Sequence, residues 1–205
     1  MASPDRKDPI RFYFDFASPY AYFAASQIDG IGAEFGRAVE WRPILMWAVL
    51  KAHGIAAPMD APVKRAYMLN DMERSAAFFG MPYKKPAKLP LSSHLAGRLF
   101  YAVHAQDPDK ALALARRLLP TLFAEERDIS DAATLTKLAA EVGIAPEATA
   151  AAMQSAVGRA GLEAAVAEAV TSGVVGSPHF LVDGEGLFGA DRLPQLRWFL
   201  SGGRT

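Results

Sequence analysis

The chain has 205 residues, of which 51% are hydrophobic and 21% charged, a balance typical of a folded globular protein with a sizeable core. Its 22 basic and 22 acidic side chains cancel, so no overall basic field indicates binding to nucleic acid or to a membrane surface. Because the chain has no cysteine, it can form neither a disulfide nor a thiolate metal site, and any thiol in its chemistry must come from a bound molecule.

Signals for export and for metal binding are not found either. The polar residues 1–9 lack the apolar core of a signal peptide, and no apolar run reaches bilayer-spanning length, so we expect a cytoplasmic protein. The four histidines do not have metal-ligand spacing, and we therefore expect no metal site.

The most informative stretch runs from Ile10 to Phe23. Aromatic and apolar residues alternate with Arg11, Tyr13 and Asp15 over residues 10–16, which predicts a strand. Ser18-Pro19 then predicts a helix over residues 20–35, because Ser is a favoured N-cap and Pro a favoured first helical residue. The Ser18 hydroxyl would lie at the positive end of the helix dipole, which suits an anion. The simpler interpretation, a helix cap with no further role, is the more common use of this dipeptide.

The next elements are a second strand and a long helical block. Residues 38–44 predict a strand, and a right-handed crossover would place it parallel to the first. Residues 45–173 have helical periodicity, with helices expected near 45–53, 63–79, 92–105, 109–123, 132–142, 146–156 and 158–171. The loops 54–62 and 81–91 are rich in Pro and small residues, so we expect them to line a cleft.

One helix of this block has a mixed polar and apolar face. Lys64, Tyr67, Met68 and Asp71 are spaced i, i+3, i+4 and i+7, so they share a face that could border a ligand. The alternative, favoured for such a helix without further context, places Tyr67 and Met68 in the core and the two charges in solvent.

Strand patterns return at the C-terminal end. Residues 176–182 predict a strand entered through Ser177-Pro178, and a turn at 183–186 makes a hairpin with a short strand at 187–188. A last helix is expected over residues 192–200, with Asp191 as its N-cap. The predicted order is therefore β-α-β, a helical insertion, then β-β-α.

This order is that of a thioredoxin-like fold interrupted by a helical domain, and four motifs resemble one family. They are FDFASPYAY from Phe14, KRAYM from Lys64 with Asp71 and Arg74 following, GSPHF from Gly176 and FGADR from Phe188. Together, in this order, they resemble the 2-hydroxychromene-2-carboxylate isomerases, relatives of the kappa-class glutathione transferases and the DsbA-like oxidoreductases. The resemblance covers about residues 10 to 200. It implies an α/β fold with thioredoxin-like residues 8–44 plus 174–203 and an all-helical insertion of residues 45–173.

The resemblance also implies a cofactor and its contacts. Ser18 and Ala21 stand where oxidoreductase relatives have their Cys-x-x-Cys pair, which excludes dithiol redox function. In the isomerases and kappa transferases, a serine at the first of these positions contacts the sulfur of glutathione, which implies that catalytic role for Ser18. Ser177 and Pro178 match the cis-proline position that pairs with the tripeptide, and we predict a cis bond there. Asp191, with Arg192 beside it, would receive the γ-glutamyl end.

The implied reaction is a glutathione-dependent cis–trans isomerisation in the breakdown of bicyclic aromatic compounds. The glutathione thiolate adds to a conjugated double bond, the resulting single bond rotates, and the thiol leaves. The family pattern assigns Lys64 to attract the substrate carboxylate, and Tyr67 and Tyr83 to act as donors or walls of the substrate pocket. One position departs from the pattern, because Ile55 replaces an Asn common in the family, and an amide contact is missing.

Two other functions remain open from the sequence. A kappa-like glutathione transferase would share Ser18, Pro178 and Asp191 but differ in its second-substrate pocket. A non-catalytic thioredoxin-fold binding protein would keep the fold without thiol-dependent turnover. The resemblance also makes a homodimer plausible.

Overall fold

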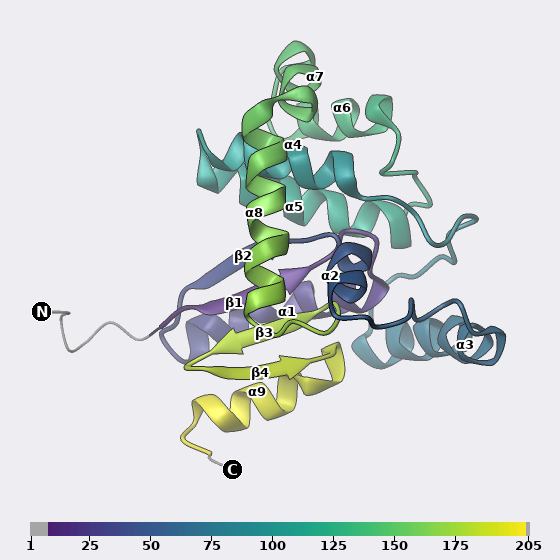
Figure 1. Ribbon diagram of the computed structural model, residues 1–205, viewed down its shortest axis with the longest axis vertical. Helices are drawn as coiled ribbons and strands as arrows, with labels where there is room; N and C mark the ends of the chain where they lie inside the picture. Colours follow the sequence, from purple (N-terminus) through teal and green to yellow (C-terminus); the bar gives the residue numbers. More distant parts are fainter. Residues whose placement is uncertain (1–7, 204–205) are drawn as a thin grey trace, which may run out of the picture.

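The computed structural model describes residues 8–203 as four strands and a series of helices (Figure 1). The polar N-terminal segment falls largely outside this range. The elements are β1 (Ile10–Phe14), α1 (Pro19–Glu34), β2 (Val39–Pro43), α2 (Met46–Ala52), α3 (Pro62–Phe79), α4 (His94–His104), α5 (Pro108–Phe123), α6 (Ala132–Glu141), α7 (Pro146–Gln154), α8 (Ala156–Thr171), β3 (His179–Val182), β4 (Glu185–Phe188), the 3-10 turn η1 (Ala190–Arg192) and α9 (Leu193–Leu200).

The four strands form one mixed sheet in the order β2-β1-β3-β4. β1 and β2 run parallel, as the predicted crossover requires, while β3 is antiparallel to both β1 and β4. This is the predicted thioredoxin-like arrangement, with the helical block inserted between β2 and β3. The C-terminal end of β1 and the N-terminal end of α1 therefore meet the segment that enters β3, which places Ser18 beside Ser177.

One face of the sheet is aromatic. Phe12 lies opposite Trp41 on β2 and Phe180 on β3, and its ring centroid is 5.2 Å and 5.6 Å from theirs. These rings are buried together with Ile28 of α1, and burial of each such side chain contributes roughly 1.5–3 kcal/mol. The alternation predicted for β1 therefore sets this face of the sheet against α1.

The other face is also covered, which the alternating pattern of β1 did not predict. Tyr13 is fully buried there against residues of α2 and α8, among them Val49 and Ala165. Its hydroxyl donates to Glu168 of α8 at 2.9 Å. Figure 1 shows α8 crossing this face, while α3 stands to one side of the sheet. Tyr13 is buried because the inserted helices return over the sheet, whereas Arg11 stays partly exposed.

The boundary between the two predicted domains is bridged by packing. Buried residues of the sheet and α1 form one continuous cluster with those of α4, α5 and α6. The division into residues 8–44 plus 174–203 and 45–173 stays a prediction. Within residues 8–203, no helix is long and apolar enough to span a bilayer.

The start of the last helix differs from the prediction. Asp191 lies inside η1, and α9 begins at Leu193 with Arg192 at its N-cap and no side-chain cap. Pro194 occupies the first turn of α9, where a residue without an N–H is tolerated, and the helix begins one residue later than expected. The Asp191 side chain is thus free of a capping bond and remains 73% exposed.

Candidate functional site

Ser18 occupies the predicted place at the N-terminus of α1. It is the N-cap residue, and its Oγ accepts a hydrogen bond from the Ala21 N–H at 3.3 Å. The same hydroxyl donates to the Ser177 carbonyl at 3.0 Å, and only 4% of the residue is exposed. The capping interpretation is therefore confirmed, and the hydroxyl also contacts the second predicted motif at the positive end of the helix dipole.

The segment before β3 is held against this hydroxyl. The Ser177-Pro178 bond is cis, as predicted. The Ser177 Oγ accepts from the Asp15 N–H at 2.8 Å, and the Pro178 carbonyl accepts from the Gly189 N–H at 3.0 Å. The cis-proline segment is thus bonded to the β1–α1 turn on one side and to the loop after β4 on the other.

A buried carboxylate, Asp15, lies beneath the turn. Its Oδ1 accepts from the Ala17 N–H at 2.9 Å and from the Ser93 hydroxyl at 2.5 Å, and its Oδ2 accepts from the Met46 N–H at 2.9 Å. Burial raises the pKa of Asp15, and the three donors oppose that rise. Asp15 therefore joins the starts of α1, α2 and α4 around Ser18.

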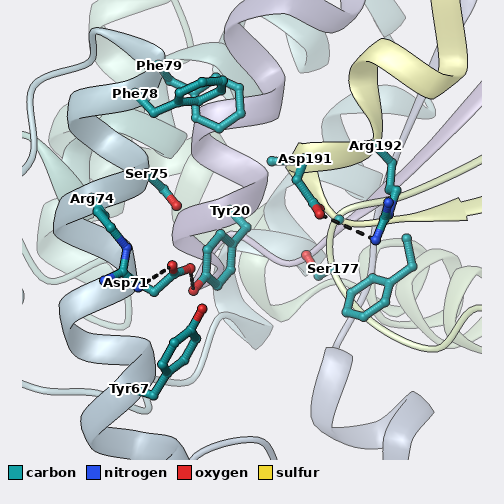
Figure 2. Close-up of a pocket in the computed structure, with 13 residues that line it drawn as sticks. Tyr20, Tyr67, Asp71, Arg74, Ser75, Phe78, Phe79, Ser177, Asp191 and Arg192 are labelled. Atoms are coloured by element: carbon teal, nitrogen blue, oxygen red, sulfur yellow. Dashed lines mark hydrogen bonds and ion pairs between the residues drawn. The ribbon is translucent and has the colours of Figure 1, made fainter.

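Two cavities meet beside Ser177. The first, called the groove, has a volume of about 640 Å³ and lies between α3 and the segment 188–192 (Figure 2). The second, called the chamber, has a volume of about 460 Å³ and is lined by Ser18, by α2 and α3, and by residues of both predicted loops. Four residues line both cavities: Tyr20, Tyr67, Ser177 and Phe188. The expectation that the loops 54–62 and 81–91 line a cleft is confirmed.

A hydrogen-bonded chain connects α1 to α3 along the groove. The Tyr20 hydroxyl donates to Asp71 at 2.8 Å, and Arg74 donates to the other carboxylate oxygen at 2.8 Å (Figure 2). Partial burial pushes the pKa of Asp71 upward, but the hydrogen bonds from Arg74 and Tyr20 outweigh it and hold that pKa below its usual range. Burial, followed by Asp71, raises the pKa of the Tyr20 phenol, which stays protonated as a donor.

Across the groove from α3, the structure places a second acid–base pair. The Asp191 carboxylate and the Arg192 guanidinium lie 3.6 Å apart, and both residues line the groove on the side opposite α3 (Figure 2). Both side chains are largely accessible. The groove therefore offers a carboxylate and a guanidinium side by side at its far wall.

The predicted substrate residues divide into two groups. Lys64 and Tyr67 line the chamber, and Tyr67 is 61% exposed, so the alternative that buries it in the core is wrong. Tyr83 lines neither the groove nor the chamber. It packs against Phe23 and Phe123, and its hydroxyl is 3.5 Å from the sulfur of Met72, a chamber residue. Burial raises the pKa of Tyr83 to about 12.

Sequence reasoning missed Asp15, Tyr20 and Ser93. Tyr20 follows Pro19 directly, so its place in the first turn of α1 was a usable signal that it borders the site. Asp15 and Ser93 had no such signal, because they meet across 78 residues of sequence.

Comparisons with known proteins identify the family of the fold. The family model of the DSBA-like thioredoxin domain matches residues 9–201. A 2-hydroxychromene-2-carboxylate isomerase of Sphingobium xenophagum is 30% identical over 93% of this chain and 97% of its own length. Glutathione s-transferase kappa 2 of Caenorhabditis elegans is 27% identical over 97% of this chain and 93% of its own.

Solved structures show the same fold. A 2-hydroxychromene-2-carboxylate isomerase structure superposes with a TM-score of 0.83 at 24% identity, covering 94% of each chain. The cytosolic disulfide reductase DsbM of Pseudomonas aeruginosa, solved with GSH, has a TM-score of 0.68 at 20% identity, covering 94% of this chain and 97% of its own. The chain therefore belongs to the DsbA-like thioredoxin family, alongside the 2-hydroxychromene-2-carboxylate isomerases and kappa-class glutathione transferases.

Proposed function

We propose that this chain is a glutathione-dependent isomerase of the 2-hydroxychromene-2-carboxylate type, acting in the breakdown of aromatic compounds. The observation that carries the proposal is the position of Ser18, a buried hydroxyl at a helix N-terminus where the groove and the chamber meet. Such a hydroxyl can hold a bound thiolate but cannot replace a redox cysteine pair. The enzymes among the relatives support this choice of reaction class.

The residues along the groove fit glutathione. The γ-glutamyl end carries an ammonium and a carboxylate, and Asp191 and Arg192 offer the matching carboxylate and guanidinium. Ser18, Ser177 and the cis bond to Pro178 lie where the groove reaches the chamber, so the thiol would point toward the second cavity. A ligand bound this way spans from η1 to the start of α1.

When bound, glutathione would supply a thiolate that adds to a conjugated double bond of the substrate and later leaves, allowing that bond to rotate. Ser18 would hold this sulfur by turning its O–H away from the Ser177 carbonyl, while the α1 dipole adds to the attraction. Each unit by which these contacts lower the thiol pKa corresponds to about 1.36 kcal/mol. The chamber walls would exclude water from the reacting atoms.

Charge at the chamber supports an anionic substrate. Lys64 and Arg65 both line it, together with the carboxylates of Asp60 and the buried Asp15. Neither cation is in an ion pair with any of residues 8–203, so both are available to a substrate carboxylate. We assign Lys64 and its neighbour to the substrate carboxylate and the Tyr67 hydroxyl to a polar group of the substrate. Tyr83 would act on the substrate only through Met72, which its hydroxyl contacts.

The test is conversion of 2-hydroxychromene-2-carboxylate into its ring-opened trans isomer, followed by absorbance and chromatography. Conversion should require reduced glutathione and should leave it unconsumed. A chain that converts nothing with glutathione present, or converts equally well without it, contradicts the proposal.

A kappa-like transferase is the second candidate, supported by the kappa relative that matches nearly the whole chain. It would join glutathione permanently to an electrophile such as a halonitrobenzene, so its product would retain the tripeptide. Mass analysis of the product separates the two reactions. We also propose a cytoplasmic location, where glutathione is kept reduced, and a homodimer, which sedimentation of the purified protein would test.

A further inference from the structure

The chamber is lined by an unusual share of the chain's methionines. The chain has seven in all, and four of them, Met46, Met59, Met68 and Met72, line this one cavity. They come from three segments, namely the start of α2, the loop before α3, and α3 itself. Met81, by contrast, lines neither the chamber nor the groove.

The thioether side chains differ in how firmly they are held. Met72 is 1% exposed, and the Tyr83 hydroxyl lies 3.5 Å from its sulfur, so this side chain forms a fixed part of the wall. Met46, Met59 and Met68 are half-buried, with no hydrogen bond to their sulfurs among residues 8–203. Three thioethers are therefore free to adjust around an occupant.

Methionine gives such a wall a particular chemistry. Its unbranched side chain fits irregular shapes, and its polarisable sulfur makes favourable contacts with the edges of aromatic rings. A leucine wall of similar volume would bury a saturated and an aromatic ring about equally well. Lys64 and Arg65 line the same cavity as Asp60 and the hydrogen-bonded Asp15, and the two cations have no ion-pair partner among residues 8–203, so they can pair with a carboxylate that binds there.

We propose that the thioethers of Met46, Met59 and Met68, set against the fixed Met72, are specificity determinants that select planar aromatic carboxylates over saturated ones of the same size. The inference rests on the proposed function in taking the chamber as the second-substrate site. One sulfur–ring contact raises affinity by about twofold to tenfold. The selection should therefore be visible as a ratio of two dissociation constants.

The experiment uses the full chain labelled with [methyl-¹³C]methionine, observed by NMR, without glutathione. The two probes are trans-cinnamate and 3-cyclohexylpropenoate, which share a carboxylate and a double bond but differ in the ring. Cinnamate should shift the four chamber methyl signals, assigned with single Met→Leu variants, while the Met81 signal stays in place. It should also bind about twofold to tenfold more tightly than the cyclohexyl probe.

The double variant Met59→Leu/Met68→Leu keeps the volume of the wall and removes two sulfurs. Its ratio of dissociation constants should fall toward one, while Met81→Leu, the control, keeps the ratio of the unmodified chain. An unchanged ratio in the double variant, or unmoved chamber signals at saturating cinnamate, overturns the inference. Because no turnover is measured, loss of the proposed isomerase activity would leave these results intact, and equal binding of both probes would leave the isomerase proposal intact.

Discussion

Replacement of Asp15 by Asn tests the account of how the site is built. The carboxylate receives three hydrogen bonds, from Ala17 and Ser93 at one oxygen and from Met46 at the other. An amide has a single acceptor oxygen. If that oxygen faces Ala17, the amide NH₂ faces the Met46 N–H; if it is reversed, the NH₂ faces the Ala17 N–H. The Ser93 hydroxyl can turn and accept, but one backbone N–H loses its partner in either orientation.

The magnitude follows from that lost partner. A buried N–H without an acceptor costs about 1–3 kcal/mol. Removing the charge weakens the remaining hydrogen bonds, which lowers stability. It also removes the cost of burying a charge, a cost that is seen in the raised pKa of Asp15. These two effects on stability oppose each other. Asp15→Asn should therefore lower the free energy of unfolding by about 1–3 kcal/mol at pH 7.

Urea unfolding followed by circular dichroism measures this change. With an m-value of about 2 kcal/mol/M, the midpoint should fall by roughly 0.5–1.5 M. Asp131→Asn is the matched control, because Asp131 caps α6 at an exposed position and should shift the midpoint much less. Equal midpoints for the two variants would refute the role assigned to the buried carboxylate.

Two further predictions concern pH and charge. Burial lowers the pKa of His179 to about 4, so below pH 6.5 the unfolded chain takes up a proton that the folded chain does not. As the pH is lowered from 6.5 to 4, the free energy of unfolding should therefore fall by about 1.4 kcal/mol per pH unit. In urea titrations at acid pH, His179→Gln should flatten that slope relative to the control variant His53→Gln, which changes an exposed histidine. In steady-state kinetics, Lys64→Met and Arg65→Met should each raise KM for the carboxylate substrate more than kcat changes; an unaltered KM in both variants removes them from substrate binding.

Local chemistry made much of the fold predictable. Ser18-Pro19 marked a helix start because a cap and a first-turn proline both act within one turn. The helix expected over residues 63–79 ends at Gly80, which takes a left-handed conformation with φ of 64° that glycine adopts at low cost. The strand order followed from the motif resemblance and the crossover rule, and needed no long-range contact.

What could not be predicted depends on distant partners or on competing local signals. In the sequence, Asp15 has the pattern of an ordinary polar residue of a strand. It joins three helix starts only because Met46 and Ser93, which are distant in the sequence, donate hydrogen bonds to it. At the last helix, two start signals lie close together, namely Asp191 as a favoured N-cap and Pro194 as a favoured first-turn residue. The helix begins at Leu193 with Pro194 in its first turn, and Asp191 does not cap it. Helical periodicity alone favoured the core for Tyr67, and only the family resemblance placed it at the substrate pocket. The structure leaves it exposed and lining the chamber.

The most direct test of the central claim is titration with reduced glutathione, followed by the ultraviolet absorbance of the thiolate. The unmodified chain should bind glutathione and lower its thiol pKa, whereas Ser18→Ala should bind without the thiolate signal. Ser155→Ala is the control, because it removes an equivalent N-cap hydroxyl at α8 from a residue that lines neither the groove nor the chamber. This variant should behave like the unmodified chain. A thiolate signal that survives in Ser18→Ala, or no binding at millimolar glutathione, would contradict the account and leave Ser18 as a helix cap alone.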